Sequence, residues 1–547
     1  MTEDRGRLAG VGRTLIGTSA GVLASALVGF GRNLSLAAAI GTGLVADAYN
    51  VANQVPAQIF LLFGGGTLAV LFVPEIMRHA RTSAQRSDEY GSFLLFASVA
   101  FGLLMTLLLV VFSPLIIKIM GGSSWSDAQS SLGLRFSLWC MPQITFAAMF
   151  SVAGQLMIAR GRIVAIGWMP TVNSLVIIAA CIPVIAVGTA QASSPGALAP
   201  WEVTLLGGST LLGSALQSML LIYFLHRGGF RLHVRFIVRG LGLRRAARAG
   251  LLTITAGALF QISNLTITAL STQAGSAAKS LGHDGRGFTA LFYALALMSI
   301  AQAMAVMGLA NVLLQRLSQH YAERGDFASS KDLDETITAV GSILIPVTAL
   351  FICLGPLGTE LIFTRGETSL ASAQFIGIVL AVLSLGLIAS AMHEVLIRTF
   401  YAANDARTPL RSAFVIVTLY ISGSFAASFQ LPPDRVLLGI AGAFSLAYLI
   451  DLPLKLHTLH KKLKFKLSRT VIRCYGIGIT AGIVAALIIR IAVTSMSEQI
   501  GHSSLARGIA LLGGFIGFLT IYYPLTARSP ASLGRLFGWL TNSRSFR

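Results

Sequence analysis

The sequence predicts an all-α polytopic membrane protein with about 14 transmembrane helices. Composition is the first reason: hydrophobic residues make up 54% of the 547 residues, charged residues only 11%, and the mean hydropathy is +0.76. Soluble proteins average about 25% charged residues, so this composition excludes a large globular enzyme. The second reason is that apolar stretches of roughly 20 residues, the length that a helix needs to cross a bilayer, recur along the whole chain.

Applying this length rule along the chain predicts two sets of six spans followed by two more. The spans lie near residues 14–40, 46–76, 90–118, 130–158, 164–188, 204–225, 249–275, 287–315, 336–358, 370–402, 409–429, 437–455, 472–491 and 507–527. The first has the basic start of a signal peptide, but its apolar run is too long and contains Arg32. We therefore expect a retained span.

The placement of the basic residues supports the span count independently. About 31 Lys and Arg residues lie in loops on one side of the predicted membrane, and about 8 lie on the other side or at its rim. Because positively charged loops face the cytoplasm, both termini are expected there and the number of spans is even. The net charge of +20 then reflects topology and contact with anionic lipids, and no nucleic-acid partner is expected.

The densest basic segments suggest how the chain is divided. They are Arg227–Arg248 and Lys455–Arg473, which follow the sixth and twelfth spans, and Gly66–Phe72 resembles Gly308–Leu314. Duplicated bundles are common in transporters. The predicted organisation is a six-helix bundle at 1–228, a second at 229–458, an extra helix pair at 459–527 and a basic cytoplasmic tail at 528–547. We expect the Arg227–Arg248 loop to lie on lipid head groups as an interfacial helix.

Neither a metal site nor a catalytic site is predicted. The four cysteines lie in apolar segments without paired or metal-ligand spacing. The ionisable residues of the spans form no nucleophile–base constellation, and no phosphate-binding loop for ATP occurs. We therefore expect a transporter without cofactors, driven by membrane potential or an ion gradient.

Arg32 and Asp47 are the most informative residues of the first two spans. A charge at that depth costs several kcal/mol, so it normally faces a protein interior or a wet cavity. Arg32 either serves such a cavity, or is a structural arginine, or reaches out to the interface. Asp47 either caps the second span or lines the cavity, and an ion pair with Arg32 would serve both uses.

A second polar cluster, His393, Glu394 and Arg398, lies in the tenth span. Glu394 and Arg398 are i,i+4 neighbours that either neutralise each other or serve proton transfer and substrate binding. The uncharged polar residues either contact a sugar or pyrophosphate or join helices by hydrogen bonds; they are Asn50, Asn53, Gln54, Gln261 and Asn264. Kinks or hinges are predicted at Pro56, Pro74, Pro142 and Gly64–Gly66; close helix packing explains the glycines equally well.

Several motifs resemble a known family. The first are Gly29-Phe30-Gly31-Arg32, Ala37–Gly41, Ala46–Tyr49, Val51–Pro56 and Phe72–Pro74. Others are Met169–Asn173, Gln261–Ser263, Leu361–Gly366 and Arg398–Pro409, in which Phe-Tyr-Ala…Asp-x-Arg-Thr-Pro is the most specific pattern. Their order over essentially the whole chain resembles the MurJ/MviN family, the bacterial lipid II flippases of the multidrug/oligosaccharidyl-lipid/polysaccharide exporter superfamily.

The resemblance implies a V-shaped pair of bundles around a cationic cavity that takes the pyrophosphate head of lipid II. The residues of this sequence assigned to that cavity are Arg32, Asp47, Asn50, Asn53, Gln261, Glu394 and Arg398. It also implies a groove along the last two spans for the polyprenyl tail, and alternating access.

The chain departs from the family pattern at several charged positions, most of them cationic. Apolar residues or glycine stand where many members carry charges: Ala26, Phe60, Leu61, Gly65 (in Gly65-Gly66, where the family has Glu-Gly), Leu295 and Ala296. The expected function is a lipid II flippase for cell-wall synthesis in the bacterial cytoplasmic membrane, with lipid II, anionic lipids and cell-wall synthesis proteins as partners. The alternatives are an ion-coupled exporter of drugs or of another polyprenyl-linked glycolipid, and an inactive paralogue that scaffolds cell-wall enzymes.

Overall fold

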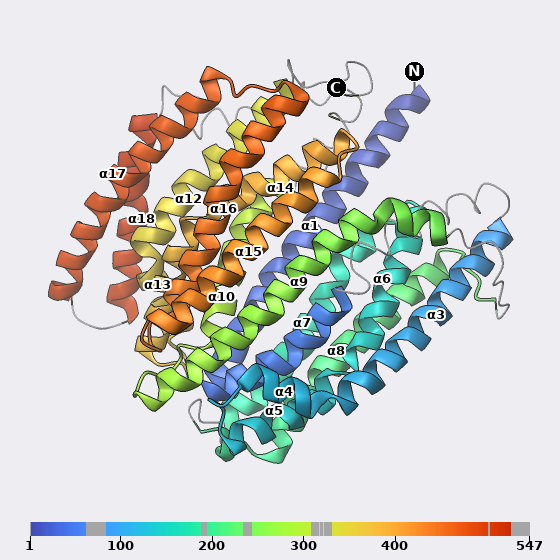
Figure 1. Cartoon of the computed structure of the whole chain (residues 1–547), viewed down its shortest axis with the longest axis horizontal. Helices are drawn as coiled ribbons and strands as arrows, with labels where there is room; N and C mark the ends of the chain where they lie inside the picture. Colours follow the sequence, from blue (N-terminus) through green and yellow to red (C-terminus); the bar gives the residue numbers. More distant parts are fainter. Residues whose placement is uncertain are drawn as a thin grey trace. The chain divides into compact units, whose positions relative to one another are not determined.

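The structure of the chain is a computed structural model. All regular secondary structure in its described part is helical (Figure 1). That part comprises residues 2–61, 84–187, 194–233, 243–307, 331–500 and 504–526, with the single residues Leu317 and Tyr321. Within these ranges twelve helices are long and apolar enough to cross a membrane, and a bent pair raises the count to thirteen. The predicted all-α membrane fold is therefore confirmed.

One predicted span is described only in part, which explains the difference from fourteen. A helical stretch covers residues 44–61, and the rest of the predicted span 46–76 lies outside the described residues. The same holds for Gly64–Gly66, Pro74, both segments of the proposed internal repeat and the tail 528–547. The duplication therefore stays a prediction.

The chain folds into two compact units. Unit 1 contains Met1–Thr289 and Gly366–Thr368, and unit 2 contains Ala290–Arg365 and Ser369–Arg547. The predicted division at residue 228 refers to the duplication and stays a prediction. By packing, α9 (Leu243–Ser280) belongs to unit 1, where it contacts α4 (Ser113–Gly121).

The long helices of unit 1 pack closely in pairs. Its further helices are α1 (Thr2–Ile40), α3 (Ala84–Val111), α5 (Asp127–Cys140), α6 (Gln143–Ala159), α7 (Val164–Val187), the short η1 (Pro195–Ala197) and α8 (Pro200–Arg227). α1 packs along α7, and α7 along α8. A Cβ on Gly167 would lie 2.8 Å from the Thr18 carbonyl oxygen, so the α1–α7 contact requires a residue without a side chain at this point.

The fourth predicted span, 130–158, is interrupted where Pro142 predicted a kink. Asp127–Ala159 crosses as one span, but α5 ends at Cys140 and α6 begins at Gln143. Proline lacks the N–H that continues a helix, which explains the interruption.

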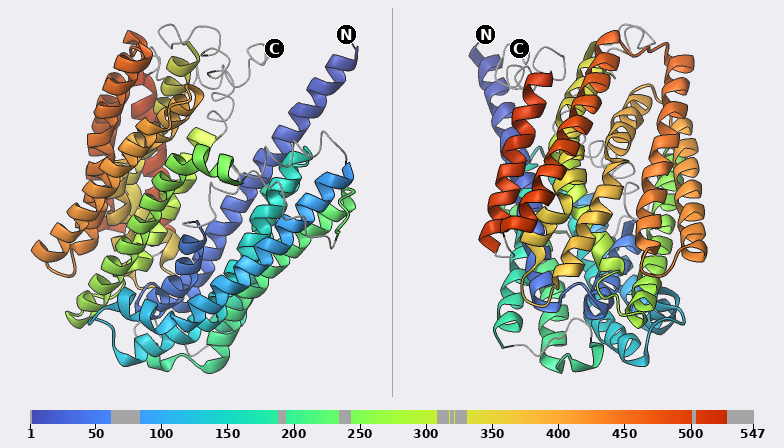
Figure 2. Two further views of the ribbon diagram at one scale, coloured as in Figure 1. Left: turned by 45° about the vertical axis from the view of Figure 1, so that its right-hand side comes forward. Right: turned by 90° about the vertical axis from the view of Figure 1, so that its left-hand side faces the viewer.

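Among the described helices of unit 2, α12 has the most extensive contacts with other helices. Figure 2 shows the helices in two further views. Its helices are α10 (Phe288–Gln302, whose first two residues belong to unit 1), the π-turn η2 (Ala303–Met307), α12 (Lys331–Phe363), α13 (Leu370–Ser384), α14 (Leu387–Ala402), α15 (Arg407–Gln430), α16 (Val436–Leu463), α17 (Arg469–Ile500) and α18 (Ser504–Thr526). α12 packs against α13, α17 and α18, and α15 packs against α16. Side chains of α12, α17 and α18 form one buried apolar cluster around Ile345, Ala485 and Phe518.

The tenth predicted span, 370–402, is bent rather than straight. α13 and α14 meet at an angle of 50° across a break of two residues. There the Gly386 N–H donates to Ser445 Oγ at 3.1 Å, and a Cβ on Gly386 would lie 2.6 Å from the Ser445 Cα. The Gly386 N–H also donates to the Leu383 carbonyl at 3.0 Å, three residues back rather than four, so the regular α-helical pattern stops here. Ser384 and Gly386 at this point are a sufficient cause of such a bend.

Candidate functional site

Arg32 lies in α1 within unit 1 and is half-buried. Its Nε and Nη2 groups donate to the Asn33 Oδ1 at 3.4 and 3.2 Å. Among the described residues no carboxylate pairs with it, so the ion pair with Asp47 considered from the sequence is not formed. An arginine inside a span that no described carboxylate neutralises keeps its charge available for an anionic ligand.

Asp47 is 1% exposed and binds a residue 242 positions away. Its Oδ1 accepts hydrogen bonds from the backbone N–H of Thr289 at 2.7 Å and from the Thr289 hydroxyl at 2.6 Å. Asn50, also buried, donates from Nδ2 to Thr289 Oγ1 at 3.0 Å. Thr289 is the second residue of α10, so the carboxylate lies at the positive end of that helix.

Two glycines make the space that the Asp47 carboxylate occupies. A Cβ on Gly287 would lie 1.8 Å from Asp47 Oδ2, and a Cβ on Gly275 would lie 3.0 Å from the same oxygen. The interpretation of Asp47 as a cap of its own helix is wrong. Asp47 lies within the 44–61 helix, past its start, because its backbone N–H donates to the Gly43 carbonyl. Its side chain accepts from the first turn of α10 instead.

Asn53 and Gln261 make different kinds of contact. Gln143 Nε2, at the start of α6, donates to the Asn53 carbonyl oxygen at 2.9 Å and to Asn53 Oδ1 at 3.1 Å. This is the hydrogen bond between helices that was one of the two interpretations for Asn53. Gln261 on α9 accepts from its exposed neighbour Asn264 at 3.4 Å, within one helix.

Glu394 and Arg398 form an ion pair on α14 in unit 2. The Arg398 Nη1 lies 3.3 Å from Glu394 Oε2, and the two side chains are 25% and 54% exposed. The structure thus forms the i,i+4 pair expected from the sequence. At this exposure such a pair is weak, about 0.3–0.5 kcal/mol, so a stronger anion can displace the carboxylate from the arginine.

The most specific family motif has a structural explanation around Asp405. Its Oδ1 accepts from the backbone N–H groups of Arg407 and Thr408, and its Oδ2 lies 2.6 Å from the Lys462 Nζ. Asn404 just before it has a φ of +55°, which turns the chain sharply from α14 into α15. Burial alone would raise the pKa of Asp405, but the hydrogen bonds from Lys462 and Thr408 outweigh it and hold this pKa below its usual 3.8.

The second loop motif, Leu361–Gly366, ends against α1. Gly366 has a φ of +57°, and a Cβ there would lie 2.1 Å from the Ala38 carbonyl oxygen. The Glu367 N–H donates to that oxygen at 3.1 Å, and the Thr368 hydroxyl donates to the Ala37 carbonyl at 2.8 Å. The loop thereby satisfies the last carbonyls of α1.

The described part of the basic loop after α8 is packed on protein. The Arg231 N–H donates to Asp88 Oδ2 at 3.0 Å, Arg160 pairs with the same carboxylate, and the Arg160 guanidinium lies 4.8 Å from the Phe230 ring centroid. Residues 234–242 lie outside the described part of the chain, so the interfacial helix stays a prediction.

Sequence reasoning missed a buried cluster in unit 2. Lys455, assigned to a cytoplasmic basic loop, is instead 3% exposed within α16 and pairs with Asp451 at 2.7 Å. The Asp451 carboxylate also accepts from the Ser412 hydroxyl at 3.0 Å, and His393 contacts both members of the pair. The available signal was the i,i+4 spacing of an acid and a base at the end of the twelfth apolar stretch.

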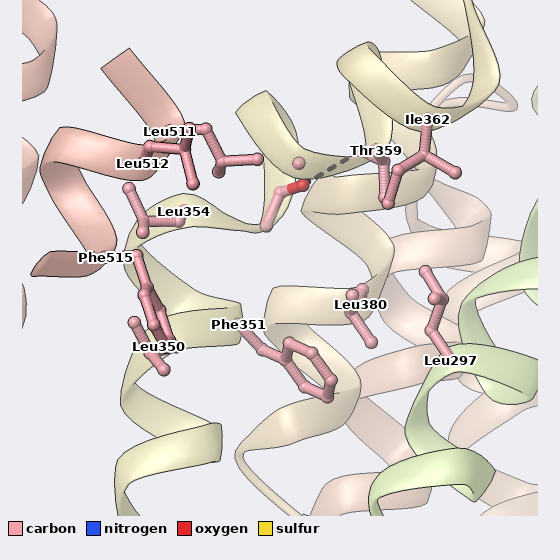
Figure 3. Close-up of a pocket in the computed structure, with 12 residues that line it drawn as sticks. Leu297, Leu350, Phe351, Leu354, Thr359, Ile362, Leu380, Leu511, Leu512 and Phe515 are labelled. Carbon is pink, nitrogen blue, oxygen red and sulfur yellow. Dashed lines mark hydrogen bonds between the residues drawn. The ribbon is translucent and has the colours of Figure 1, made fainter. Parts of the chain in front are cut away.

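An apolar cavity of about 270 Å³ lies between α10, α12, α13 and α18, within unit 2 (Figure 3). Figure 3 shows leucine and phenylalanine side chains surrounding it, among them Leu297, Phe351, Leu380, Leu511 and Phe515. The only side-chain oxygen in this wall belongs to Thr359, and it donates to the Gly355 carbonyl of the helix itself at 2.9 Å. The cavity therefore fits a hydrocarbon ligand.

No group of three or more His, Cys, Asp or Glu side chains within the described ranges could hold a metal ion. All four cysteines are buried and free.

The fold and these sites define a multi-pass membrane transporter. One solved structure with this fold is "Lipid II flippase MurJ, inward closed conformation", with a TM-score of 0.72 and 17% identity over 94% of this chain and 99% of that chain. Another is an inward-facing multidrug resistance MATE family transporter of the MOP superfamily, with a TM-score of 0.57 and 14% identity over 82% and 95%.

Sequence comparison identifies the family. The model of the lipid II flippase MurJ family matches residues 36–511, and the chain belongs to this family. A probable lipid II flippase MurJ of Rhizobium meliloti is 26% identical over 77% of this chain and 75% of that protein. The lipid II flippase MurJ of Burkholderia cenocepacia is 23% identical over 74% and 76%. The resemblance noted from the motifs is confirmed, and the chain is a transporter rather than an enzyme.

Proposed function

We propose that this chain flips lipid II, the lipid-linked precursor of peptidoglycan, across the bacterial cytoplasmic membrane by alternating access. Family membership over residues 36–511 is the observation that carries this proposal. Membrane potential or an ion gradient drives the movement, and both termini lie in the cytoplasm. Anionic lipids and cell-wall synthesis proteins are further proposed partners.

In this proposal Arg32 is the main ligand of the pyrophosphate. It is a half-buried arginine that no described carboxylate neutralises, and a guanidinium binds phosphate oxygens bidentately. The family's other cationic positions are apolar here, at Phe60 and Ala296 for example. Arg32 therefore carries a larger share of head-group binding than a single arginine would in a richly cationic cavity.

The other proposed cavity residues divide by their contacts. Arg398 is the second proposed phosphate ligand, because its exposed partner Glu394 is easily displaced. Asp47 and Asn50 act through Thr289, so we propose that they position the start of α10 beside the cavity. The Asn53 and Gln261 amides retain donor capacity for the sugar–peptide part of the head group.

The apolar cavity beside α18 supports a site for the polyprenyl tail. Its lining is aliphatic and aromatic, and burial of each CH₂ group contributes about 0.8 kcal/mol. A lipid tail docked there leaves the head group attached to a fixed anchor while the units alternate between states.

Rescue of a bacterium depleted of its own lipid II flippase tests the proposal. We expect this chain and its Arg435→Ala variant to restore growth and lipid II translocation, and Arg32→Ala to fail. Arg435 is a suitable control because it lies in a loop with its side chain 70% exposed. Failure of the well-expressed, correctly inserted wild-type protein to rescue would overturn the proposed substrate.

The fold-level likeness to a MATE transporter keeps an ion-coupled exporter as the second candidate, for drugs or another polyprenyl glycolipid. Efflux of drugs from cells that express the chain would favour it. Unchanged growth and translocation with Arg32→Ala would instead favour a scaffolding paralogue.

A further inference from the structure

The strongest unexplained feature of the protein is the cluster of His393, Asp451 and Lys455 in unit 2. The Asp451 and Lys455 side chains are 3% and 1% exposed and lie 2.7 Å apart on α16. His393 on α14 is also buried, with Nδ1 3.5 Å from Asp451 Oδ2 and in hydrogen-bond contact with Lys455 Nζ. Removing charges from water costs several kcal/mol per ion, so a cluster kept at this depth is a candidate for a function.

The special feature of this cluster is that one atom, His393 Nδ1, faces both a donor and an acceptor. The Lys455 ammonium is a donor only, and the Asp451 carboxylate is an acceptor only. A neutral imidazole with its proton on Nε2 accepts from Lys455 at Nδ1. When a proton from water binds the Nδ1 lone pair, that acceptance ends, the imidazolium and the Lys455 ammonium compete for the single Asp451 carboxylate, and the cluster gains one positive charge.

The groups around His393 come from several helices of unit 2. They are Glu394 on α14, Asp451, Lys455 and Tyr448 on α16, and the Ser412 hydroxyl on α15, which donates to Asp451. The Tyr448 ring meets the imidazole edge to face, with centroids 5.3 Å apart. Protonated His393 would thus lie close to the Lys455 ammonium, and the repulsion between two buried cations weakens the attachment of α14 to α16.

α14 is the helix whose movement matters for the proposed transport. It also carries Glu394 and Arg398, the residues proposed to face the head group, and it begins at the 50° bend after α13. A bend held by the Gly386–Ser445 hydrogen bond gives the helix a point about which to move. Arg398 lies on the same helix as His393, so a change in how His393 attaches α14 to α16 would reach Arg398.

We propose that His393, Asp451 and Lys455 form a proton-binding site that attaches α14 to α16 when His393 is neutral and releases α14 when His393 takes up a proton. The coupling role rests on the proposed flippase function: binding and release of a proton at this site couple transport to the proton gradient.

Hydrogen exchange of the purified full-length protein tests the site without any substrate. Between about pH 8 and pH 5, the range in which histidine changes charge, we expect amide exchange in α14, corrected for intrinsic rates, to become on the order of tenfold faster. In His393→Gln this pH dependence is lost, whereas His457→Gln keeps it. His457 is the matched control because it is an exposed histidine on the same α16.

A double variant guards against misfolding of His393→Gln. Asp451→Asn with Lys455→Met removes both buried charges at similar volume, a replacement that proteins tolerate, and should also abolish the pH response of α14. A wild-type α14 whose exchange ignores pH overturns the site, and so does an unchanged response in either cluster variant.

Flipping of a fluorescent lipid II analogue in proteoliposomes, with the membrane potential clamped at zero, tests the coupling. We expect a transmembrane pH gradient to change the rate severalfold in wild type and His457→Gln and to have no effect in His393→Gln. Wild-type flipping that ignores the gradient overturns the coupling role. Absence of any wild-type flipping, with the exchange response intact, overturns the proposed function and retains the proton site.

Discussion

Replacing Asp47 with alanine should destabilise unit 1 strongly, because Asp47 satisfies the start of α10 from a distant helix. The carboxylate is buried and accepts two hydrogen bonds, from the N–H and the hydroxyl of Thr289. In Asp47→Ala both donors lose a charged acceptor, whereas the hydrogen bond from Asn50 Nδ2 to Thr289 Oγ1 remains.

The expected loss follows from these contacts. A hydrogen bond to a charged group contributes about 1.5–3 kcal/mol net. A negative charge at a helix N-terminus adds about 0.3–1 kcal/mol. Because the two bonds share one acceptor and are not fully additive, we expect the free energy of unfolding to fall by about 3–5 kcal/mol.

Reversible unfolding of the purified protein in mixed micelles measures this change. Asp47→Asn should lose less, because an amide oxygen can still accept both bonds. Asp127→Ala is the control: this carboxylate also lies in the first turn of a helix, α5, but it is exposed, so its loss should stay below about 1 kcal/mol. Equal stability of Asp47→Ala and wild type would refute the structural role assigned to the carboxylate.

Three further substitutions follow from the described contacts. Gly366→Ala should lower the unfolding free energy by at least about 1 kcal/mol, because the residue has a positive φ and its Cβ would collide with the Ala38 carbonyl; Gly161→Ala, with a positive φ in open space, is the milder control that isolates the collision. Asp405→Asn should be less stable than wild type at pH 7, and the difference should vanish as the pH falls below 3.8. Because the folded-state pKa of Asp405 is depressed, its contribution is present at neutral pH and is lost on protonation; a difference that persists at low pH would contradict this. Leu511→Trp should fill part of the apolar cavity and slow flipping of a long-chain lipid II analogue severalfold while sparing a short-chain one, and equal slowing of both would argue against a tail site.

The polar residues show where sequence reasoning succeeded and where it did not. The Glu394–Arg398 pair was predictable because its two members are one helical turn apart. The Asp47–Thr289 contact was not, since nothing local indicates which distant helix start will receive a buried carboxylate. Lys455 was misassigned because lysine at the end of an apolar stretch usually marks a loop, and only the packing of α14 and α15 on α16 encloses it.

The sequence by itself determined the all-α membrane fold, the approximate position of the described spans and the family, because transfer of a helix into a bilayer depends on a sum over roughly 20 consecutive residues. Motifs such as Arg398–Pro409 are also made of neighbouring residues, so the family could be recognised without the tertiary structure. The tertiary structure alone decided the bend between α13 and α14, the partner of Asp47 and the His393–Asp451–Lys455 cluster. A buried polar group must find its partner on whichever helix packs beside it, and that depends on how helices far apart in sequence meet.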